Sequence, residues 1–523
     1  MISNRFTIRG GDYEQAGAAS SALKVHLKRV GAAPEAVRRA MIAAYEAEMN
    51  VVIHADNGDM TFSMDTEKLK VEVTDEGPGI PDIALAMTEG YSTAPSVARE
   101  LGFGAGMGLP NIKKNSDRFS INSVVGQGTR VEFTILLSPQ RMDAAAHNSV
   151  AADAQKCRQC LRCISACPTE ALRLVRGKLT ILDHLCIDCA ACIGACSTGA
   201  LGVKGLTPAL PEHRKGMALV LPAAFLSQFG AGVGGEQIVR VLGDIGFEEV
   251  IVADAWEVAL REAVIKCSEE GTVPRPVISP ACPAVVNLVE SRFPSLIAHL
   301  APFCSPLEAI RHGLAGRSAI FVIACPGQRS VLERDSGVMA IAPATLRHVI
   351  LPQVVALRRE APKPVRETKE GPESPGLLRV SGIRHVINVL EDMENGLLQD
   401  MRVIETAACE QGCFGSPLLS EDPFVGRHRW ETSRAMADVT AAVVKRSAPY
   451  AARPGVRLDP DMAQAIAKLS RIEKLTKSLP GRDCAMCGAP TCAAFAEDVV
   501  LGRAEKSACC HLTKTAAEKE DSQ

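Results

Sequence analysis

The chain has 523 residues, which is longer than one hydrophobic core ordinarily serves, so several domains are expected. Its 58 lysines and arginines nearly balance 60 aspartates and glutamates, so no overall positive field is expected to attract nucleic acid or an acidic membrane surface. Its longest uncharged stretch, 217–235, is too broken by proline and glycine to predict a membrane span. The first residues lack the pattern of an export signal, so a cytoplasmic location is expected. In that reducing environment the 19 cysteines suit metal binding or redox chemistry better than disulfides.

The first 140 residues contain no cysteine and carry four short motifs in order. A helical pattern in "AVRRAMIAAYEAEMNVVIHA" places Glu46 and Asn50 four residues apart and therefore on one face. A predicted strand in "VEVTDEGPGIPD" runs into a loop that holds Asp75. Glycines in that loop and in "LGFGAGMGLPNIKK" would let main-chain amides approach phosphate closely, and "GQGTRVEF" completes the set. Alone, each motif also fits a solvated helix face or an ordinary turn.

In this order the motifs resemble the Bergerat-fold ATPases, in particular the anti-sigma-factor serine kinases. The resemblance implies that Asn50 coordinates magnesium, that Glu46 acts as the catalytic base and that Asp75 reads the adenine amino group of ATP. It also implies nucleotide contacts from Gly77, Gly79, Gly104, Gly106, Gly108 and Thr129. His26 and His54 are isolated, so the expected phosphoacceptor is a serine or threonine in a separate protein of the anti-anti-sigma type. A retained fold that no longer binds nucleotide is the alternative.

The small-residue stretch 141–155 is expected to link this domain to a cysteine-rich segment at 156–204. That segment contains C-x2-C-x2-C-x3-C twice, a spacing in which one loop grips a cubane with three thiolates while its fourth cysteine reaches the other cluster. It resembles the two-cluster ferredoxins of bacteria, and a pair of zinc knuckles is the alternative. The expected ligands are Cys157, Cys160, Cys163 and Cys196 for cluster one, and Cys186, Cys189, Cys192 and Cys167 for cluster two.

Residues 205–450 carry dispersed cysteines, four of which follow short apolar runs. In an open α/β sheet, loops beyond the carboxyl ends of several strands can bring such cysteines to one site. The segments resemble the three cysteine motifs of the large subunit of iron-only hydrogenases, and the resemblance implies a 4Fe-4S cluster on Cys282, Cys325, Cys409 and Cys413. In that family the last of these also bridges to a diiron centre. Cys267 and Cys304 match no motif and fit buried core positions, which is also the alternative for the other four.

Two departures from that family's pattern concern hydrogen chemistry. Ala281 stands where the family has a proton-relaying cysteine, and an aliphatic side chain cannot relay a proton. Gln328 stands where the family has a lysine that binds a cyanide ligand of the diiron unit. We therefore expect a hydrogenase-derived electron carrier or sensor without fast hydrogen evolution. The charged, proline-rich stretch 359–376 is expected to be an exposed insertion in this domain.

The last part of the chain is expected to hold a helical linker at 451–478, with a helix over 459–478, and a small metal module at 479–512. The module has the spacing C-x2-C-x4-C followed by a later cysteine. It resembles the four-cysteine iron–sulfur domain of corrinoid and electron-transport proteins, with a zinc site as the alternative. The expected ligands are Cys484, Cys487, Cys492 and Cys509, although the adjacent Cys510 competes for the last position. A frayed tail follows.

Together these segments predict a multidomain α/β and α+β protein: a Bergerat-fold ATPase domain, a ferredoxin-like two-cluster domain, a hydrogenase-like α/β domain and a small C-terminal iron–sulfur domain. The expected cofactors are four 4Fe-4S clusters and ATP with magnesium. The leading hypothesis is a redox regulator that couples cluster state to an ATP-dependent serine/threonine kinase or ATPase. The alternative is an electron-transfer subunit of a soluble hydrogenase or electron-bifurcating complex. Its redox partners would be a ferredoxin, or hydrogenase and flavin subunits.

Overall fold

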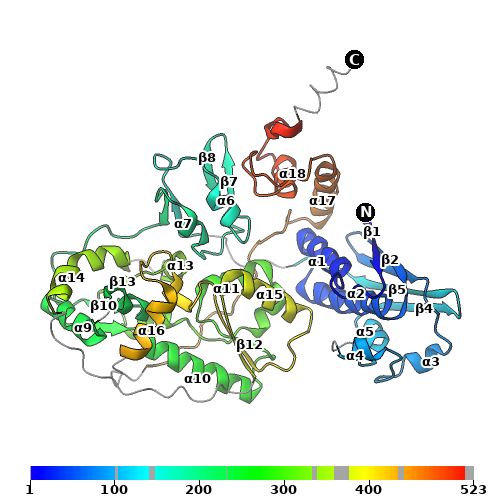
Figure 1. Cartoon of the computed structure of the whole chain (residues 1–523), viewed down its shortest axis with the longest axis horizontal. Helices are drawn as coiled ribbons and strands as arrows, with labels where there is room; N and C mark the ends of the chain where they lie inside the picture. Colours follow the sequence, from blue (N-terminus) through cyan, green and yellow to red (C-terminus); the bar gives the residue numbers. More distant parts are fainter. Residues whose placement is uncertain are drawn as a thin grey trace.

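The computed structural model of the chain describes residues 2–100, 104–140, 148–230, 232–332, 338–357, 376–433 and 441–512. Its architecture is multidomain and mixes helices with parallel and antiparallel sheets (Figure 1). Residues 141–147 of the expected linker, 359–375 of the expected insertion and the tail after residue 512 lie outside the described part. Among the described helices, none combines the length and the apolar character that crossing a bilayer requires.

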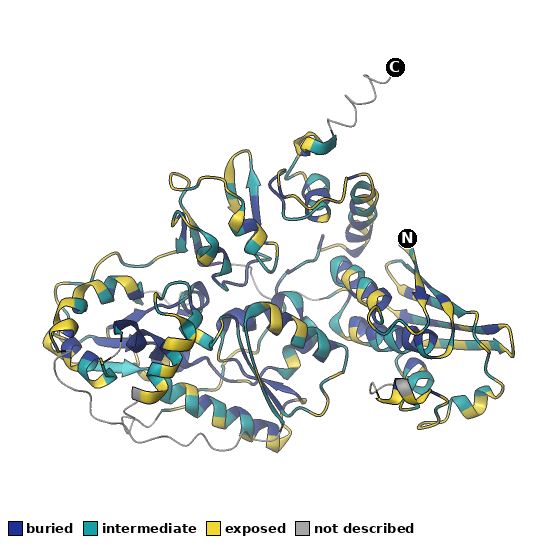
Figure 2. Ribbon diagram, in the orientation of Figure 1, coloured by how far each residue is buried: buried dark blue, intermediate teal, exposed yellow. Residues whose placement is uncertain are grey.

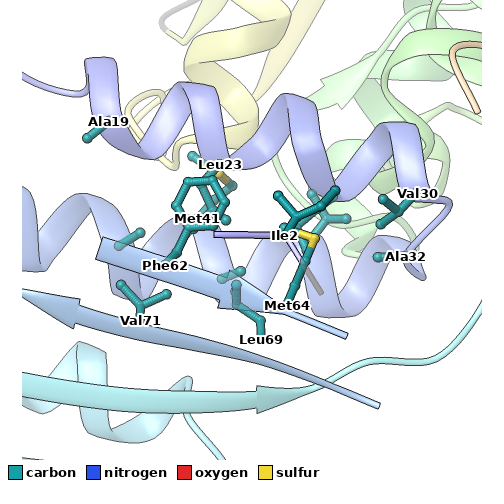
Figure 3. Packing of buried hydrophobic residues seen from close by; sticks show 14 of the residues in the cluster. Ile2, Ala19, Leu23, Val30, Ala32, Met41, Phe62, Met64, Leu69 and Val71 are labelled. Atoms are coloured by element: carbon teal, nitrogen blue, oxygen red, sulfur yellow. The ribbon is translucent and has the colours of Figure 1, made fainter. Parts of the chain in front are cut away.

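The N-terminal unit is built on a five-stranded antiparallel sheet in the order β1-β2-β3-β5-β4. Buried residues alternate with more exposed ones along β2 and β3, so each strand presents one apolar face. α1 and α2 pack on that face, and Leu23, Met41, Phe62 and Val71 meet in the core between the two layers (Figure 3). The elements are β1 (Ile2–Arg9), α1 (Ala18–Val30), α2 (Pro34–His54), β2 (Asn57–Met64), β3 (Lys68–Asp75), α3 (Ile83–Ala86), α4 (Ser96–Glu100), α5 (Gly108–Lys114), β4 (Arg118–Val124) and β5 (Gly128–Leu136).

A small cysteine-rich unit follows and consists of two matching halves. Each half has a cysteine run whose third cysteine lies in a five-residue helix, and the two helices pack against each other. Antiparallel pairs β6–β9 and β7–β8 frame the helices. The elements are β6 (Val150–Ala152), α6 (Arg162–Ala166), β7 (Leu172–Val175), β8 (Lys178–Ile181), α7 (Ala191–Ala195) and β9 (Leu201–Val203).

The third unit contains two parallel sheets, ordered β11-β10-β13-β14 and β12-β16-β15. β10 and β13 are buried along their whole length, as expected for parallel strands that helices cover on both faces (Figure 2). The first sheet and its helices are β10 (Ala218–Leu221), α8 (Ala223–Leu226), α9 (Gly235–Asp244), β11 (Glu249–Val252), α12 (Pro306–Gly313), β13 (Ala319–Val322), α13 (Pro326–Leu332), β14 (Met339–Ile341) and α14 (Pro343–Leu357). The second sheet and the remaining helices are α10 (Asp254–Glu270), β12 (Val277–Ile278), α11 (Pro283–Arg292), β15 (Leu377–Ser381), α15 (Ile383–Glu394), β16 (Val403–Ala407) and α16 (Pro423–Ser433).

The last unit contains α17 (Met462–Lys477), inside the helix expected at 459–478, and α18 (Cys492–Val500). Although it is distant in sequence, this unit packs on α1 of the N-terminal unit (Figure 1). Ile466, Leu469 and Phe495 belong to the same continuous buried cluster as Leu23 and Leu27. The first and last units of the chain therefore share one hydrophobic core.

Candidate functional site

Glu46 and Asn50, which were expected on one helix face, both lie on α2, opposite the start of α5. The Nδ2 group of Asn111 donates a hydrogen bond of 2.7 Å to Oε1 of Glu46. A Cβ atom added at Gly108 would lie 3.1 Å from Oδ1 of Asn50 and 3.4 Å from Oε2 of Glu46, so α5 begins directly against both side chains. Burial raises the pKa of Glu46, and the hydrogen bond from Asn111 opposes that rise. A glutamate with a raised pKa is better matched to proton transfer near neutral pH.

Asp75 lies at the end of β3, where β5 begins beside it. Its Oδ1 atom accepts hydrogen bonds from the main-chain amides of Gly77, at 2.8 Å, and Thr129, at 3.2 Å. Gly128 has a φ of 96°, and a Cβ atom there would lie 2.0 Å from the carbonyl oxygen of Asp75. Only glycine fits that contact, and it keeps the carboxylate fixed at the strand end.

The other glycines of the motifs also lie in close contacts within this unit. A Cβ atom at Gly79 would lie 2.3 Å from the carbonyl oxygen of Val124. The carbonyl oxygen of Gly106 accepts a hydrogen bond of 3.0 Å from the amide of Gly90. Gly104 packs against the segment that follows Gly90. All three motif glycines have positive φ values, between 73° and 80°, which favour glycine. Gly104 and Gly106 therefore lie just before α5, which begins against Glu46 and Asn50.

The two cysteine runs of the second unit have matching backbones. In each run the second and fourth residues after the first cysteine adopt positive φ: Gln159 and Leu161 in one, Asp188 and Ala190 in the other, with values of 55° to 66°. Such left-handed residues are uncommon outside glycine. Alternating right- and left-handed residues turn successive amides toward one concavity, a feature of anion and iron–sulfur sites. The repeated conformation fits an anionic cluster in each run.

The structure brings together thiols from both runs. Burial raises the pKa of Cys163 to about 11, and the neighbouring thiols of Cys196 and Cys157 add to the rise. Burial likewise raises the pKa of Cys189 to about 12, with a contribution from Cys167. The fourth cysteine of each run thus lies beside the other run. Cys186 and Cys192 are buried near Cys189, whereas Cys160 is exposed on its loop.

Four thiols of the third unit also gather, from three segments that are far apart in sequence. Cys282 and Cys325 immediately precede α11 and α13, while Cys409 and Cys413 follow β16. Burial raises the pKa of Cys325, and the thiols of Cys282 and Cys409 add to the rise. Burial also raises the pKa of Cys413, with contributions from Glu257 and then from Cys325 and Cys282. Thiols whose pKa values are raised in this way, such as those of Cys325 and Cys409, need a compensating positive charge before they can ionise.

Gln328 lies directly beside this group. Its Oε1 atom accepts a hydrogen bond of 2.7 Å from the amide of Ala324, which fixes the orientation of the amide group. Its Nε2 atom lies 3.7 Å from the sulfur of Cys413 and can donate to it. A neutral amide donor therefore stands next to Cys413.

The cysteine run at 186–192 docks on the same region of the third unit. The main-chain amide of Gly327, in α13, donates a hydrogen bond of 3.1 Å to the carbonyl oxygen of Asp188. Nδ2 of Asn287, in α11, donates 3.3 Å to the carbonyl oxygen of Ile187. Cys189 is close enough to Cys409 to contribute to the raised pKa of that thiol. The second-unit and third-unit cysteine sites are thus neighbours.

The C-terminal cysteines surround a small hollow lined by Cys484, Cys487, Cys492, Cys509, Cys510 and His511. Cys509 is buried in the shared core, whereas Cys510 is exposed. Burial raises the pKa of Cys487, and Cys509 contributes to the rise. Asp483, whose Oδ1 accepts the amide of Cys492 at 2.6 Å, has a positive φ of 46°. These contacts favour Cys509 over Cys510 as the inward-facing thiol.

Nowhere in the described ranges do three histidine, cysteine or acidic side chains stand close enough to share a single metal ion. Cys267 and Cys304, which match no motif, are buried as expected.

Four family models match the chain, in the order that the motifs predict. They describe a histidine kinase-like ATPase domain over residues 11–135, a 4Fe-4S dicluster domain over 156–201, the C-terminal domain of the iron-only hydrogenase large subunit over 217–314, and an Fe-S cluster domain over 479–511. The serine/threonine-protein kinase RsbT of Bacillus subtilis is 36% identical over 98 residues, which are 18% of this chain and 68% of that kinase. The chain belongs to the histidine kinase-like ATPase family.

Another relative in the histidine kinase-like ATPase family is the anti-sigma F factor of Caldanaerobacter subterraneus. It is 33% identical over 111 residues, which are 21% of this chain and 69% of that factor. Among solved structures, an FeFe-hydrogenase of Chlamydomonas reinhardtii is similar with a TM-score of 0.32 and 15% identity, over 43% of this chain and 85% of that one.

Within this member of the histidine kinase-like ATPase family, two polar residues that contact the predicted site residues were not singled out by the motifs. Asn111 donates a hydrogen bond to Glu46, and its position three residues after Gly108 in a helical stretch could have indicated a side chain on the same helix face as Gly108. Ser123 bonds the hydroxyl of Thr129 at 2.9 Å and accepts the amide of Ile80 at 2.7 Å, which ties the two strand ends together. Nothing in the local sequence around Ser123 signals that contact.

Proposed function

We propose that the chain is a redox-responsive regulator, in which 4Fe-4S clusters at its cysteine sites are coupled to ATP handling by the serine-kinase-like domain. One observation carries the proposal: the C-terminal four-cysteine unit shares a continuous core with the ATPase unit. Cys509 belongs to that core, and Cys487 and Cys492 pack against it. Close-packed interiors transmit strain, so a change at these cysteines acts on the side chains that support α1 and the sheet.

In the ATPase unit, Asn50 would bind the magnesium of ATP, Glu46 would act as the base, and Asp75 would accept a hydrogen bond from the adenine amino group. The fixed carboxylate of Asp75 and the position of Gly108 beside Asn50 support these roles. The motif glycines after Asp75 and before α5 would bring main-chain amides close to the phosphates of ATP. Since the relative of Bacillus subtilis is named a serine/threonine-protein kinase, a serine or threonine of a separate, anti-anti-sigma-type protein is the proposed phosphoacceptor.

The sixteen motif cysteines would hold four 4Fe-4S clusters, in the four groupings that the motif spacings and the family resemblances imply. When bound, the clusters supply one-electron storage and transfer. The repeated left-handed loops of the second unit and the desolvated thiols of the third unit support this assignment. We propose no hydrogen evolution, because Ala281 offers no ionisable group and Gln328 presents a neutral amide next to Cys413.

Polar contacts between the units supply the proposed route of coupling. Glu473 of α17 accepts a hydrogen bond of 3.0 Å from Asn4 of β1, and it also pairs with His26 of α1. Arg29 of α1 pairs with Glu497 of α18 at 2.6 Å. On the other side of the C-terminal unit, the main-chain amide of Leu174 in β7 donates a hydrogen bond of 2.8 Å to the carbonyl oxygen of Gly488. The C-terminal unit thus contacts both the ferredoxin-like unit and α1.

The proposal predicts a redox-dependent affinity for ATP with magnesium. Affinity and turnover would be measured anaerobically on the holoprotein with its clusters fully oxidised and then fully reduced, with Asn50→Ala as the control for the ATP site. We expect a difference of at least about tenfold, which corresponds to roughly 1.4 kcal/mol of coupling. Equal affinity in both states, still abolished by Asn50→Ala, would contradict the coupling.

A second prediction concerns the proposed base. Glu46→Gln is expected to lower phosphoryl transfer about 10²- to 10⁴-fold while changing ATP affinity much less, because the amide cannot accept the proton. In the wild type the rate should fall as pH drops through the raised pKa of Glu46. Asn111→Ala removes a hydrogen bond that lowers this pKa, so the acidic limb of the pH profile should move to higher pH. An unmoved limb would exclude Glu46 as the titrating group.

The alternative is an electron-transfer subunit, and one observation favours it. The run at 186–192 docks on α11 and α13, so two cysteine sites from different units lie side by side. In this alternative the ATPase unit would serve as a docking module. ATP binding that is insensitive to redox state, together with rapid reduction of all clusters by a ferredoxin, would favour this function over the regulator.

A further inference from the structure

A cavity of about 360 Å³ lies where the four units of the chain meet. Its walls come from α1, the loop after Cys167, the ends of α11 and α15, residues 455–457 and α18, elements that surround one region of the molecule (Figure 1). Six cations line it: Lys24, Lys28, Arg29, Arg173, Arg292 and Arg457. Ligand pockets of this size occur preferentially at domain interfaces. None of the proposed ATP-site residues or cysteine ligands lines this cavity.

On the α1 side, two of these cations share one carboxylate. Nζ of Lys24 and Nζ of Lys28 each lie 2.7 Å from the same oxygen, Oε2 of Glu394. Glu394 is buried, and its other oxygen accepts the hydroxyl of Ser295. One carboxylate therefore faces two ammonium groups, which leaves a positive charge on this wall.

On the α18 side, three arginines share two carboxylates. Glu497 pairs with Arg29 at 2.6 Å and with Arg503 at 2.8 Å. Asp498 pairs with Arg173 and, at 2.8 Å, with Arg503. Glu170, which lines the cavity beside Arg173, is a third carboxylate on this wall, so its cations and carboxylates are equal in number.

Arg457 adds a further charge, because its guanidinium donates to the main-chain carbonyl oxygens of Asp459, Gln140 and Pro460. The other charged pair facing the cavity is neutral overall. Arg292 and Glu391 pair with each other at 2.8 Å.

We infer that this cavity binds a small soluble polyanion of the phosphate-ester class, at a site distinct from the proposed ATP pocket. Cations outnumber carboxylates on the α1 side, and Arg457 adds a further positive charge, so an anion with two or more charges would complete the pairing. Phosphate oxygens accept hydrogen bonds from lysine and arginine readily. Such a ligand would touch α1 of the ATPase unit, the loop after Cys167 and α18 at once, so it would act as an effector that goes beyond the redox coupling proposed above.

Inorganic pyrophosphate, used without divalent metal and at constant ionic strength, is the test probe. Calorimetric titration of the holoprotein should show saturable binding, and Lys28→Met should weaken it at least about tenfold, a change of roughly 1.4 kcal/mol. Lys70→Met is the matched control, because Lys70 pairs with Glu132 on the sheet and does not line the cavity. Equal loss in both variants, or no saturable binding in the wild type, would overturn the inference.

A second measurement needs no variant. Burial lowers the pKa of Lys28 to about 8, so a substantial fraction of its amine is neutral and open to acylation at mildly alkaline pH. Pyrophosphate should slow acylation of Lys28 at least about threefold by raising that pKa and covering the amine. Exposed Lys156 should react at an unchanged rate. Binding without protection of Lys28 would locate the anion elsewhere and overturn the assignment.

Discussion

Gly128→Ala is expected to lower the affinity for ATP with magnesium by about 100-fold or more, equivalent to roughly 2.8 kcal/mol. The new Cβ atom would lie 2.0 Å from the carbonyl oxygen of Asp75, and the φ of 96° at this position already disfavours a side chain. The strand end must move to relieve the contact, and Asp75 moves with it. The measurement is titration with a fluorescent ATP analogue on the holoprotein, with near-ultraviolet circular dichroism to verify the fold.

Gly126→Ala provides the matched control for that variant. Gly126 has a similar positive φ of 77° and lies two residues away, but a Cβ atom there meets nothing within 4 Å. Its substitution costs only the left-handed strain, on the order of 1 kcal/mol, in an exposed turn. We expect its ATP affinity to stay within about threefold of wild type. If both variants bind ATP like the wild type, the loop of Asp75 is not the adenine site.

The elements that carry chemistry were largely predictable from local sequence. The doubled cysteine spacing predicted a two-cluster unit, and the family models match there and in the other three segments. The helix face of Glu46 and Asn50, and the strand leading to Asp75, lie in α2 and β3 as the periodicity indicates. Buried Cys267 and Cys304 also agree with expectation. Short-range patterns such as these depend on neighbours within one or two turns.

The arrangement of the units was not predictable in the same way. An amphipathic pattern predicts that α17 buries one face, yet it does not say that the partner is α1, more than 400 residues earlier. The pairing of Arg173 with Asp498 joins residues separated by 325 positions, and both read as ordinary surface charges in sequence. The crossing of Cys167 and Cys196 to opposite runs was expected from spacing, whereas the docking of residues 186–192 on α11 had no sequence signal. Long-range packing is a property of shape and charge complementarity that one sequence does not display.

Asp498→Ala is expected to destabilise the junction of the ferredoxin-like and C-terminal units by about 3–5 kcal/mol. Asp498 and Arg173 are each only 3% exposed, so removing the carboxylate leaves a buried guanidinium without its partner. Hydrogen exchange is the suitable measurement, because a multidomain chain does not unfold in one step. Amides of β7 and α18 should exchange about 10²- to 10⁴-fold faster than in the wild type.

Two comparisons separate this buried charge from a general effect of mutation at the junction. Glu505→Ala breaks the neighbouring ion pair with Arg176, which is 3.8 Å long and whose two side chains are 86% (Arg176) and 78% (Glu505) exposed. Because this pair is exposed, the variant should leave the amide exchange rates unchanged within about twofold. Replacing Arg173 by methionine and Asp498 by leucine together should recover much of the lost protection, because no unpaired charge is then buried. If the double variant is as labile as Asp498→Ala, lost packing and not the unpaired arginine accounts for the effect. The redox dependence of ATP affinity would then be measured on the double variant. If the dependence persists, the shared apolar core couples the cysteine sites to the ATPase unit; if it is lost, the charged contact between Arg173 and Asp498 does so.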